Sequence, residues 1–343
     1  MGMLFSAEDE IAQVKMHRPH VVILGAGASI ASFLNGDKNG KKLPSMLNFV
    51  DVLDLSSMLD DVGIPHKGRN FEDIYDQIHN DTKLVNLKQK LEDAVYDYFS
   101  SLEIKDEPTI YDHLVLSLRS KDVIATFNWD PFLVQALRRN GVNGRKFKLP
   151  RLQFLHGNVM IGFCHTDKVT GVLGAACSHC GQRFTPSKLL YPIGKKNYHL
   201  DNFISEQWSD LHNQMQNAFM ITVFGYGAPK SDVSAIDLMK AAWGDVNSRY
   251  MEQTEIVDIR EEDDLRETWE PFIHTHHYKV HDNFYDSWIA NHTRRTGEAY
   301  INQYIDAMFI DNNPVPQDLD FPELWDWFEK LQKVEEGQAR LAK

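Results

Sequence analysis

Cysteine, basic side chains and long apolar runs are all scarce in this 343-residue sequence. Its three cysteines are too few for a disulfide framework, and their odd number fits a reducing compartment. Lys and Arg number 36 against 49 Asp and Glu, so the net charge is −13, which argues against binding nucleic acid through phosphate neutralisation. No segment approaches the roughly 18 apolar residues of a membrane span, and the N-terminus lacks a signal-peptide pattern. We therefore expect a cytoplasmic protein with no membrane anchor and no direct contact with nucleic acid.

Six short apolar, β-branched segments have the pattern of buried strands. They are His20–Leu24, Lys121–Thr126, Arg151–Leu155, Phe219–Phe224, Thr254–Ile259 and His276–Val280. Long helix-patterned stretches separate them, which favours a parallel sheet with helices on both faces over a sandwich of hairpins. The sequence predicts an α/β protein built on a Rossmann-like, doubly wound parallel sheet.

Two segments between predicted strands are longer than a crossover helix requires. Residues 45–118 carry apolar side chains at three-to-four spacing in Phe71–His79 and Leu84–Tyr98, so we expect a mostly helical insertion packed beside the sheet. Residues 157–199 hold all three cysteines and show little periodicity, which indicates a small, loop-rich lobe. Both insertions are expected to belong to one domain, residues 1–282.

The remaining C-terminal tail, residues 283–343, is predicted to be helical with a break at Asn312–Pro316. From Phe321 onward it is amphipathic, and this last segment is either a docking helix or a packed end cap. Its aromatic side chains are a candidate contact surface for a partner, but covering the sheet explains them equally well. These side chains are Trp325, Trp327 and Phe328.

A glycine turn follows the first predicted strand, where Gly25, Ala26 and Gly27 lead to a predicted helix that begins at Ser29. A strand, a glycine turn and a helix N-terminus bring free N–H groups and the positive end of a helix dipole together, which suits a pyrophosphate. Ile30 stands where a dehydrogenase fingerprint has its third glycine, so an ordinary dehydrogenase is disfavoured. A tight turn with only a packing role is the alternative.

Polar side chains follow the second and third predicted strands. Thr126, Asn128 and Asp130 alternate along the chain, so they share one side at the carboxyl end of a strand, where doubly wound folds bind ligands. Asp130 is also expected to cap the helix that begins at Pro131. His156 follows the third strand, in a position where a lone histidine is often only structural.

The fourth and fifth predicted strands end in a second glycine turn and in an acid. The turn is Gly225-Tyr226-Gly227, and it leads to a helix that Ser231 or Asp232 can cap. Asp258 ends the fifth strand, where a carboxylate can accept hydrogen bonds from ribose hydroxyls. A surface turn explains an acid in that place equally well.

In this order and spacing, the motifs resemble those of the sirtuin family, and more closely its divergent bacterial sirtuin-like branch than the protein deacetylases. Gly25–Ser29 looks like the family's phosphate turn, Thr126–Asp130 like its T-x-N-x-D motif and Leu155–Gly157 like its catalytic H-G. Gly225–Gly227 is similar to the family's Gly-Thr/Tyr-Ser, and Asp258 falls where sirtuins commonly hold the adenosine ribose. The resemblance spans roughly Val21 to Val280 and implies an NAD-binding domain of Rossmann type.

The cysteines resemble one half of the zinc ribbon that this family builds from two C-x-x-C pairs. Cys164, Cys177 and Cys180 lie within 17 residues, and no second cysteine stands beside Cys164. A tetrahedral structural zinc needs four N, S or O ligands. The fourth ligand is open, with three candidates: His165, Asp167 and His179. The alternative is a vestigial ribbon in which the cysteines only fill apolar space.

Several positions depart from the family pattern. Phe127 stands where ordinary sirtuins have Gln, and Gly227 where they have Ser. The family's Leu-Pro after the phosphate turn appears as Leu43-Pro44, displaced by an insertion that includes Asn35–Lys42. Leu189–Lys196 replaces the peptide-binding strand that follows the ribbon. These departures weaken the deacylase interpretation most.

The resemblance implies an enzyme that cleaves the nicotinamide–ribose bond of NAD. His156 is the expected general base, Asn128 is expected to orient the nicotinamide ribose or a water, and Asp130 to position the leaving carboxamide. Because the peptide-binding motif is missing, we expect water to attack, which makes the protein an NAD glycohydrolase that releases nicotinamide and ADP-ribose. An NAD-dependent protein deacylase and a non-catalytic module that senses NAD or ADP-ribose remain as alternatives.

The sirtuin-like branch further implies a biological role, the depletion of NAD in bacterial anti-phage defence. Such an enzyme must stay silent until it is triggered. We therefore expect a homo-oligomer, a regulatory partner such as a nucleic-acid sensor or an ATPase, or both.

Overall fold

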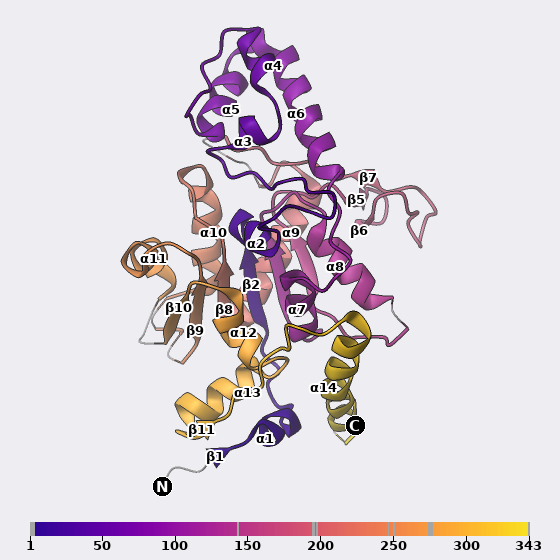
Figure 1. Ribbon diagram of the computed structural model, residues 1–343, viewed down its shortest axis with the longest axis vertical. Helices are drawn as coiled ribbons and strands as arrows, with labels where there is room; N and C mark the ends of the chain where they lie inside the picture. The colour runs from indigo at the N-terminus through magenta and orange to yellow at the C-terminus, as the bar shows by residue number, and fades with distance from the viewer. Residues whose placement is uncertain are drawn as a thin grey trace.

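The computed structural model describes residues 4–341 except 143, 194–195, 197, 246, 250 and 274–276. A six-stranded sheet forms its centre (Figure 1). Its strands are β2 (His20–Leu24), β3 (Val123–Thr126), β4 (Arg151–Phe154), β8 (Met220–Phe224), β9 (Gln253–Val257) and β10 (Tyr278–His281). Each overlaps a segment predicted to be a strand, so the six strands are confirmed, although β9 begins one residue before its predicted segment and β10 ends one residue after its own. The predicted start of the last strand, His276, lies outside the described residues.

The strand order is that of a doubly wound sheet. All neighbouring strands are parallel, and the order across the sheet is β10-β9-β8-β2-β3-β4. The first three strands in the chain run outward from β2 to one edge and the last three run outward from β8 to the other. The order therefore reverses between β2 and β8, which is where ligands bind in open α/β sheets. The predicted fold class is confirmed.

The strands also end level with one another. Leu24 pairs with Thr126 on one side and with Phe224 on the other, and Phe224 pairs with Val257. The residues that follow these strands therefore leave the sheet along one common edge, as the sequence motifs require.

Helices cover both faces of the sheet because its strands are apolar on both sides. Val22, Leu24 and Ile124 pack on one face against α2 (Ala26–Ser32), α7 (Ile110–Ser117), α8 (Phe132–Gly141) and α12 (Trp288–Asn291). The opposite face, with Val21 and Ile23, packs against α9 (Asn202–Asn217), α10 (Val233–Trp243) and α11 (Glu262–Trp269).

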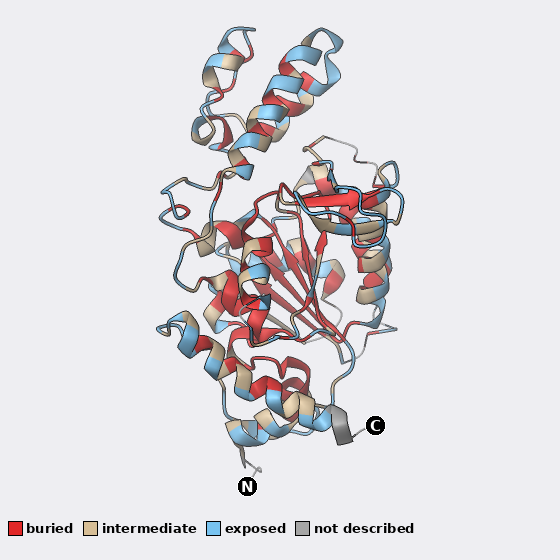
Figure 2. Cartoon of the chain, turned by 90° about the vertical axis from the view of Figure 1, so that its right-hand side faces the viewer, coloured by how far each residue is buried: buried red, intermediate tan, exposed pale blue. Residues whose placement is uncertain are grey.

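The sequence predicted a helical insertion packed beside the sheet. In the structure the insertion lies over the carboxyl end of the sheet instead (Figure 1, Figure 2). It contains α3 (Phe49–Val52), α4 (Ser56–Asp60), α5 (Phe71–Asn80) and α6 (Val85–Ser100). Phe49 explains the position. Its ring stacks on Phe71 of α5 with the ring centroids 4.1 Å apart, and its centroid lies 6.4 Å from that of Trp129, beside the end of β3. Helix α7, also within residues 45–118, packs instead with α2 and α8 beside the sheet.

The cysteine-containing lobe is more regular than the sequence suggested. It holds a small antiparallel sheet in the order β6-β5-β7, formed by β5 (Ile161–Cys164), β6 (Val169–Val172) and β7 (Thr185–Pro186). After β7 the chain returns to the main sheet, where Ser187 Oγ accepts a hydrogen bond from Asn158 N (3.1 Å) and Leu190 N donates one to His156 O (2.9 Å). The lobe therefore fixes the segment that covers the end of β4.

Beyond α12, the tail lies at the amino end of the sheet (Figure 1). It contains α13 (Thr296–Tyr300), β11 (Phe309–Ile310), which pairs with β1 (Leu4–Phe5), and α14 (Phe321–Leu341). The guanidinium groups of Arg294 and Arg295 are buried and both pair with Glu335 of α14. Of the two alternatives for this last helix, α14 is a packed end cap and not a free docking helix. Phe328 is buried, and Trp325 Nε1 donates a hydrogen bond to Asn140 Oδ1 at 2.7 Å.

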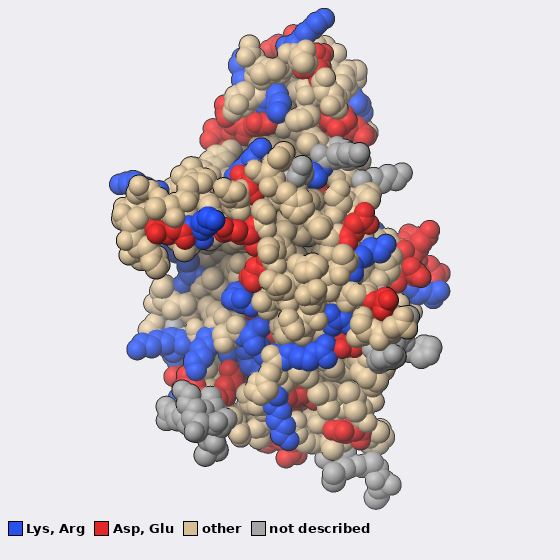
Figure 3. Space-filling model, turned by 180° about the vertical axis from the view of Figure 1, so that it is seen from behind, with Lys and Arg blue, Asp and Glu red and all other residues tan. Residues whose placement is uncertain are grey.

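The surface charge is unevenly distributed. On the face seen in Figure 3, Lys and Arg side chains form a band below the middle of the molecule, with Asp and Glu side chains above and beneath it. Within the described ranges, no helix is both long enough and apolar enough to span a bilayer.

Candidate functional site

The two glycine turns pack against each other at the point where the strand order reverses. A Cβ atom on Gly25 would lie 2.5 Å from Gly225 O, and one on Gly225 would lie 2.2 Å from Ala28 N. Gly225 also has a φ of +61°, which glycine adopts without strain. Both glycines are therefore required for the close approach of the two turns. The first glycine turn thus has the packing role that the sequence offered as an alternative to phosphate binding.

Two backbone N–H groups of the first turn already donate hydrogen bonds within the two turns. Gly27 N donates to Gly225 O at 2.9 Å, and Ala28 N donates to Gly25 O at 3.1 Å. A pyrophosphate at this place therefore receives fewer N–H donors than the sequence pattern alone suggests.

Replacing Gly225 by alanine is expected to lower the free energy of unfolding by about 2 kcal/mol, because the added methyl group meets backbone atoms that cannot turn aside. Chemical denaturation of purified protein measures this change. Gly227→Ala is the matched control, since a Cβ atom there has nothing within 4 Å. Equal stability of the two variants would contradict the packing role.

Asn128 is the centre of a buried hydrogen-bond network between the first and second strands. Its Nδ2 donates to Gly25 O (2.8 Å) and to Ser29 Oγ (3.0 Å), and Ser29 Oγ donates to Asp130 Oδ2 (2.7 Å). The Tyr111 hydroxyl lies 2.6 Å from Ser29 Oγ. This network fixes the Asn128 amide, and no residue in the described part of the chain donates a hydrogen bond to its Oδ1.

Asp130 is buried at the end of this network. Burial raises the pKa of Asp130 to about 6, although the Ser29 hydroxyl and Phe132 N donate hydrogen bonds to its carboxylate. The bond from Phe132 N, at 3.3 Å, supports the predicted helix-capping role. At neutral pH the carboxylate is mostly ionised, and it presents a fixed negative charge with little solvent around it.

His156 is also buried, and its ring is held between aromatic side chains. Its centroid lies 4.7 Å from that of Phe127, edge to face, and 5.9 Å from that of Tyr198. Its Nε2 lies 3.2 Å from the Tyr198 hydroxyl. Burial lowers the pKa of His156 to about 3, so the imidazole is neutral at physiological pH and has a lone pair available to accept a proton.

Asp232 lies beside His156. The sequence suggested Ser231 or Asp232 as the cap of the next helix, and Asp232 stands at the N-cap position of α10, but its side chain makes no capping hydrogen bond. Its Oδ1 accepts from the buried Lys196 ammonium, and its Oδ2 accepts from the Tyr226 hydroxyl at 2.8 Å. Burial opposes ionisation of Asp232, but the charge of Lys196 and these two hydrogen bonds hold its pKa below the usual value. The carboxylate is thus ionised, and each of its oxygens accepts a hydrogen bond.

These groups surround one cavity of about 340 Å³ between the carboxyl end of the sheet and the helical insertion. The predicted site residues that line it are Gly25, Ala26, Ser29, Asn128, Asp130, His156, Gly225, Tyr226 and Gly227. Leu43 and Pro44 line it too, despite their displacement in the sequence, and so do Leu190, Pro192 and Lys196 of the segment after the small lobe. One cavity thus collects side chains from four of the strand ends.

Three predicted residues do not line this cavity. Gly27 packs against Gly225, and Thr126 Oγ1 accepts a hydrogen bond from Asn128 N at 3.0 Å. The Asp258 carboxylate forms an ion pair with Arg260 at 3.0 Å. Thr126 therefore supports the loop of Asn128, whereas the acid at the end of β9 is engaged elsewhere.

Sequence reasoning missed three polar residues of the site. Tyr111 comes from α7, and the cavity-lining Glu72 and Lys196 come from the helical insertion and from the segment after the small lobe. Burial raises the pKa of Glu72. None of these residues follows a strand, so no local pattern marks them.

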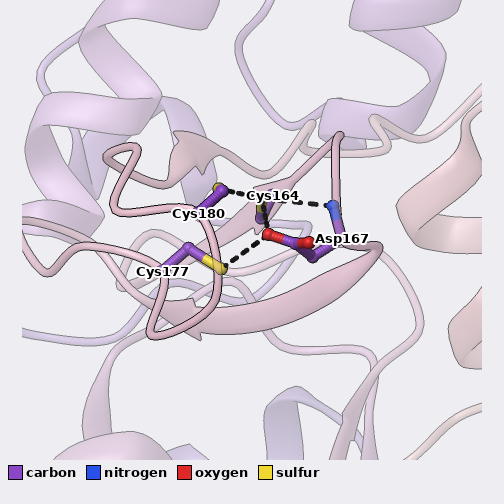
Figure 4. Close-up of side chains that lie close together, drawn as sticks. All are labelled: Cys164, Asp167, Cys177 and Cys180. Atoms are coloured by element: carbon purple, nitrogen blue, oxygen red, sulfur yellow. Dashed lines mark hydrogen bonds between the residues drawn. The ribbon is translucent and has the colours of Figure 1, made fainter.

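The three cysteines converge on Asp167 (Figure 4). Asp167 Oδ2 lies 3.2 Å from Cys177 Sγ and 3.5 Å from Cys164 Sγ, and the sulfurs of Cys164 and Cys180 are 3.5 Å apart. The four ligand atoms lie within 4.8 Å of one another. Zinc–sulfur bonds of about 2.3 Å give a tetrahedron with edges of about 3.7 Å, so these four residues fit a structural zinc. Of the three candidates for a fourth ligand, the structure brings Asp167 to the cysteines.

Comparison with known proteins gives structural similarity only. No protein-family model matches the sequence, and no curated protein matches it. Among solved structures, a Sir2 homologue in complex with NAD is 13% identical, with 96% of this chain and 92% of that chain covered and a TM-score of 0.34. A Sir2 variant with a deacetylated p53 peptide and 3′-O-acetyl ADP-ribose is 13% identical, with 87% and 96% covered and a TM-score of 0.37.

A third similar structure, a variant Sir2 homologue in complex with ADP-ribose, is 13% identical, with 95% and 96% of the two chains covered and a TM-score of 0.34. Similarity at this level carries no argument about activity. The function proposed below therefore rests on the residues of the site.

Proposed function

We propose that the protein binds NAD in the cavity between β2 and β8 and hydrolyses its nicotinamide–ribose bond. The observation that carries the proposal is the convergence of Asn128, Asp130 and His156 on one cavity, at the switch point of a doubly wound sheet. Cleavage of this bond builds positive charge on the sugar carbon while neutral nicotinamide leaves, so a site needs anchoring, a dry pocket and a base.

Each of the three residues has a state that suits its proposed role. His156 is neutral and accepts the proton of an attacking water or of a ribose hydroxyl. Asn128 has a fixed amide whose Oδ1 is available to orient the ribose or the water. Asp130 is a buried carboxylate that can accept a hydrogen bond from the nicotinamide carboxamide. The buried aromatic rings of Phe127 and Tyr226, whose centroids are 4.0 Å apart, give the cavity an apolar wall.

Product analysis tests the proposal against its two alternatives. Purified protein is incubated with NAD, with and without an acetylated peptide, and the products are separated by liquid chromatography. A hydrolase gives nicotinamide and ADP-ribose in equal amounts without peptide. Release that depends on the peptide indicates a deacylase, and binding of NAD with no release indicates a sensing module. Either of these results would contradict hydrolysis.

We also propose that this hydrolysis depletes NAD in anti-phage defence and that a homo-oligomer or a regulatory partner holds the enzyme silent. Support comes from the resemblance of the strand-end motifs to the bacterial sirtuin-like branch. The three aromatic residues of α14 are poor candidates for the partner surface, because they pack against their own chain. Sedimentation analysis, alone and with the product of a neighbouring gene, measures the assembly.

We further propose that Cys164, Asp167, Cys177 and Cys180 hold one structural zinc, which closes the small lobe ahead of the segment that carries Leu190 and Lys196. Elemental analysis is expected to find about one zinc per chain, and both Asp167→Ala and Cys177→Ser are expected to lose most of it, since three ligands hold zinc poorly. His165→Ala and His179→Ala are the controls and are expected to retain it. Retention by Asp167→Ala with loss from a histidine variant would contradict the assignment.

A further inference from the structure

The charges around the cavity do not suit the pyrophosphate of NAD unless one side chain moves. Three carboxylates line the cavity: those of Glu72, Asp130 and Asp232. Among the described residues that line it, Lys196 is the single Lys or Arg. Two N–H groups of the first glycine turn are already bonded within the turns. A dianion that enters therefore has one cationic partner to recruit.

Lys196 is engaged with Asp232, and His156 stands next to the same carboxylate oxygen. The Lys196 ammonium contacts Asp232 Oδ1, while His156 Nε2 lies 3.9 Å from that oxygen. The second oxygen, Oδ2, is taken by the Tyr226 hydroxyl at 2.8 Å. Lysine and histidine thus compete for one acceptor, and the lysine holds it in this structure.

We propose that Lys196 is a substrate-operated switch: the pyrophosphate of NAD draws the Lys196 ammonium away from Asp232, and Asp232 then becomes the positioning residue of His156. The inference rests on the proposed function, because it needs an anionic ligand in this cavity. No covalent bond changes in the step. Lys196 stays protonated and exchanges one anionic partner for another.

The exchange strengthens the base when substrate is present. Burial lowers the pKa of His156 to about 3, with Asp232 acting against this effect and Lys196 adding to it. A base is most effective when its pKa is near the working pH, so His156 in the structure is a weak one. With Lys196 on the phosphates, Asp232 is free to stabilise the imidazolium that forms when His156 takes a proton. The other titratable groups that face this pair are Glu72, Tyr198 and Tyr226.

The first experiment follows the His156 imidazole by nitrogen-15 NMR in the ligand-free protein. In the wild type, His156 is expected to stay neutral from about pH 5 to 8. In Lys196→Met it is expected to titrate within this range, because the unpaired Asp232 carboxylate then holds the proton on Nε2. The double variant Lys196→Met, Asp232→Asn removes both charges, so it is expected to fold well and to keep His156 neutral. Lys188→Met, an exposed lysine beside the neighbouring cavity, is the control.

The second experiment measures the affinity of ADP-ribose and of inorganic pyrophosphate by calorimetry. Lys196→Met is expected to bind both about 10- to 100-fold more weakly than the wild type, whereas Lys188→Met is expected to bind as the wild type does. ADP-ribose is also expected to raise the pKa of His156 in the wild type. Unchanged affinity in Lys196→Met, or a His156 that stays neutral in that variant, would overturn the switch.

The two failures are distinguishable. If the wild type binds neither NAD nor ADP-ribose, the proposed function and the substrate-operated step are both overturned. The competition between Lys196 and His156 is still decided by the NMR titration of the ligand-free variants. If the wild type binds ADP-ribose and Lys196→Met binds it equally well, only the switch is overturned.

Discussion

Replacing His156 by alanine is expected to lower the rate of nicotinamide release from NAD by roughly 10²- to 10⁴-fold, the range that loss of a general base produces. His156 is the single histidine among the described residues that line the cavity. The fold is expected to survive, because the imidazole is neutral and Asp232 keeps its ion pair with Lys196. Liquid chromatography of nicotinamide measures the rate, and circular dichroism measures the fold.

His113 provides a matched control. Burial lowers the pKa of His113 to about 4, and its Nδ1 lies 2.9 Å from the Tyr285 hydroxyl, so it is also a neutral, buried histidine bonded to a tyrosine. It sits in α7, outside the cavity. His113→Ala is expected to lose stability and to keep its turnover per folded molecule. Equal loss of turnover in the two variants would show that the effect of His156→Ala is structural.

Asp130→Asn is expected to stabilise the protein at neutral pH while it lowers turnover. The pKa of Asp130 rises from 3.8 to about 6 on burial, which corresponds to a cost of about 3 kcal/mol for the ionised carboxylate in the folded state. Asparagine removes that cost and keeps the shape. Turnover is expected to fall on the order of 100-fold, because the charged acceptor that positions the nicotinamide carboxamide is lost.

The sign of the pH dependence follows from the raised pKa. The protonated carboxyl group favours the folded state, so its contribution to stability is fully present below about pH 4 and is lost as the pH rises to about 6. The wild type is therefore expected to lose stability relative to Asp130→Asn over this interval. Urea unfolding at a series of pH values measures the difference. A gain in the variant that is as large at pH 3.5 as at pH 7 would refute this account of Asp130.

The sheet and the strand-end motifs were predictable from local patterns. A strand such as His20–Leu24 is recognisable because four consecutive apolar residues, Val21 to Leu24, occur together and all are buried. The strand-end motifs converge because parallel strands of similar length end at one edge, so Asn128 and His156 meet through topology alone. Asp258 ends a strand at the same edge, but its neighbour Arg260 engages the carboxylate, and no periodicity reports such a local pair.

The parts that could not be predicted come from the insertions. Lys196 reaches Asp232 because the small lobe returns the chain over the end of β4, and Glu72 reaches the cavity because α5 stands above the sheet. Neither position depends on a pattern around the residue itself. The choice of Asp167 over His165 and His179 has the same cause, since the turn between β5 and β6 directs its carboxylate toward the cysteines.

The central claim is that this cavity binds NAD and breaks its nicotinamide–ribose bond. The most direct test measures two quantities on the same samples of wild type and His156→Ala: the NAD-induced rise in melting temperature and the nicotinamide released. We predict that NAD raises the melting temperature of both proteins and that the wild type alone releases nicotinamide and ADP-ribose in equal amounts. Absence of both binding and release at millimolar NAD, or equal release by the two proteins, would contradict the claim.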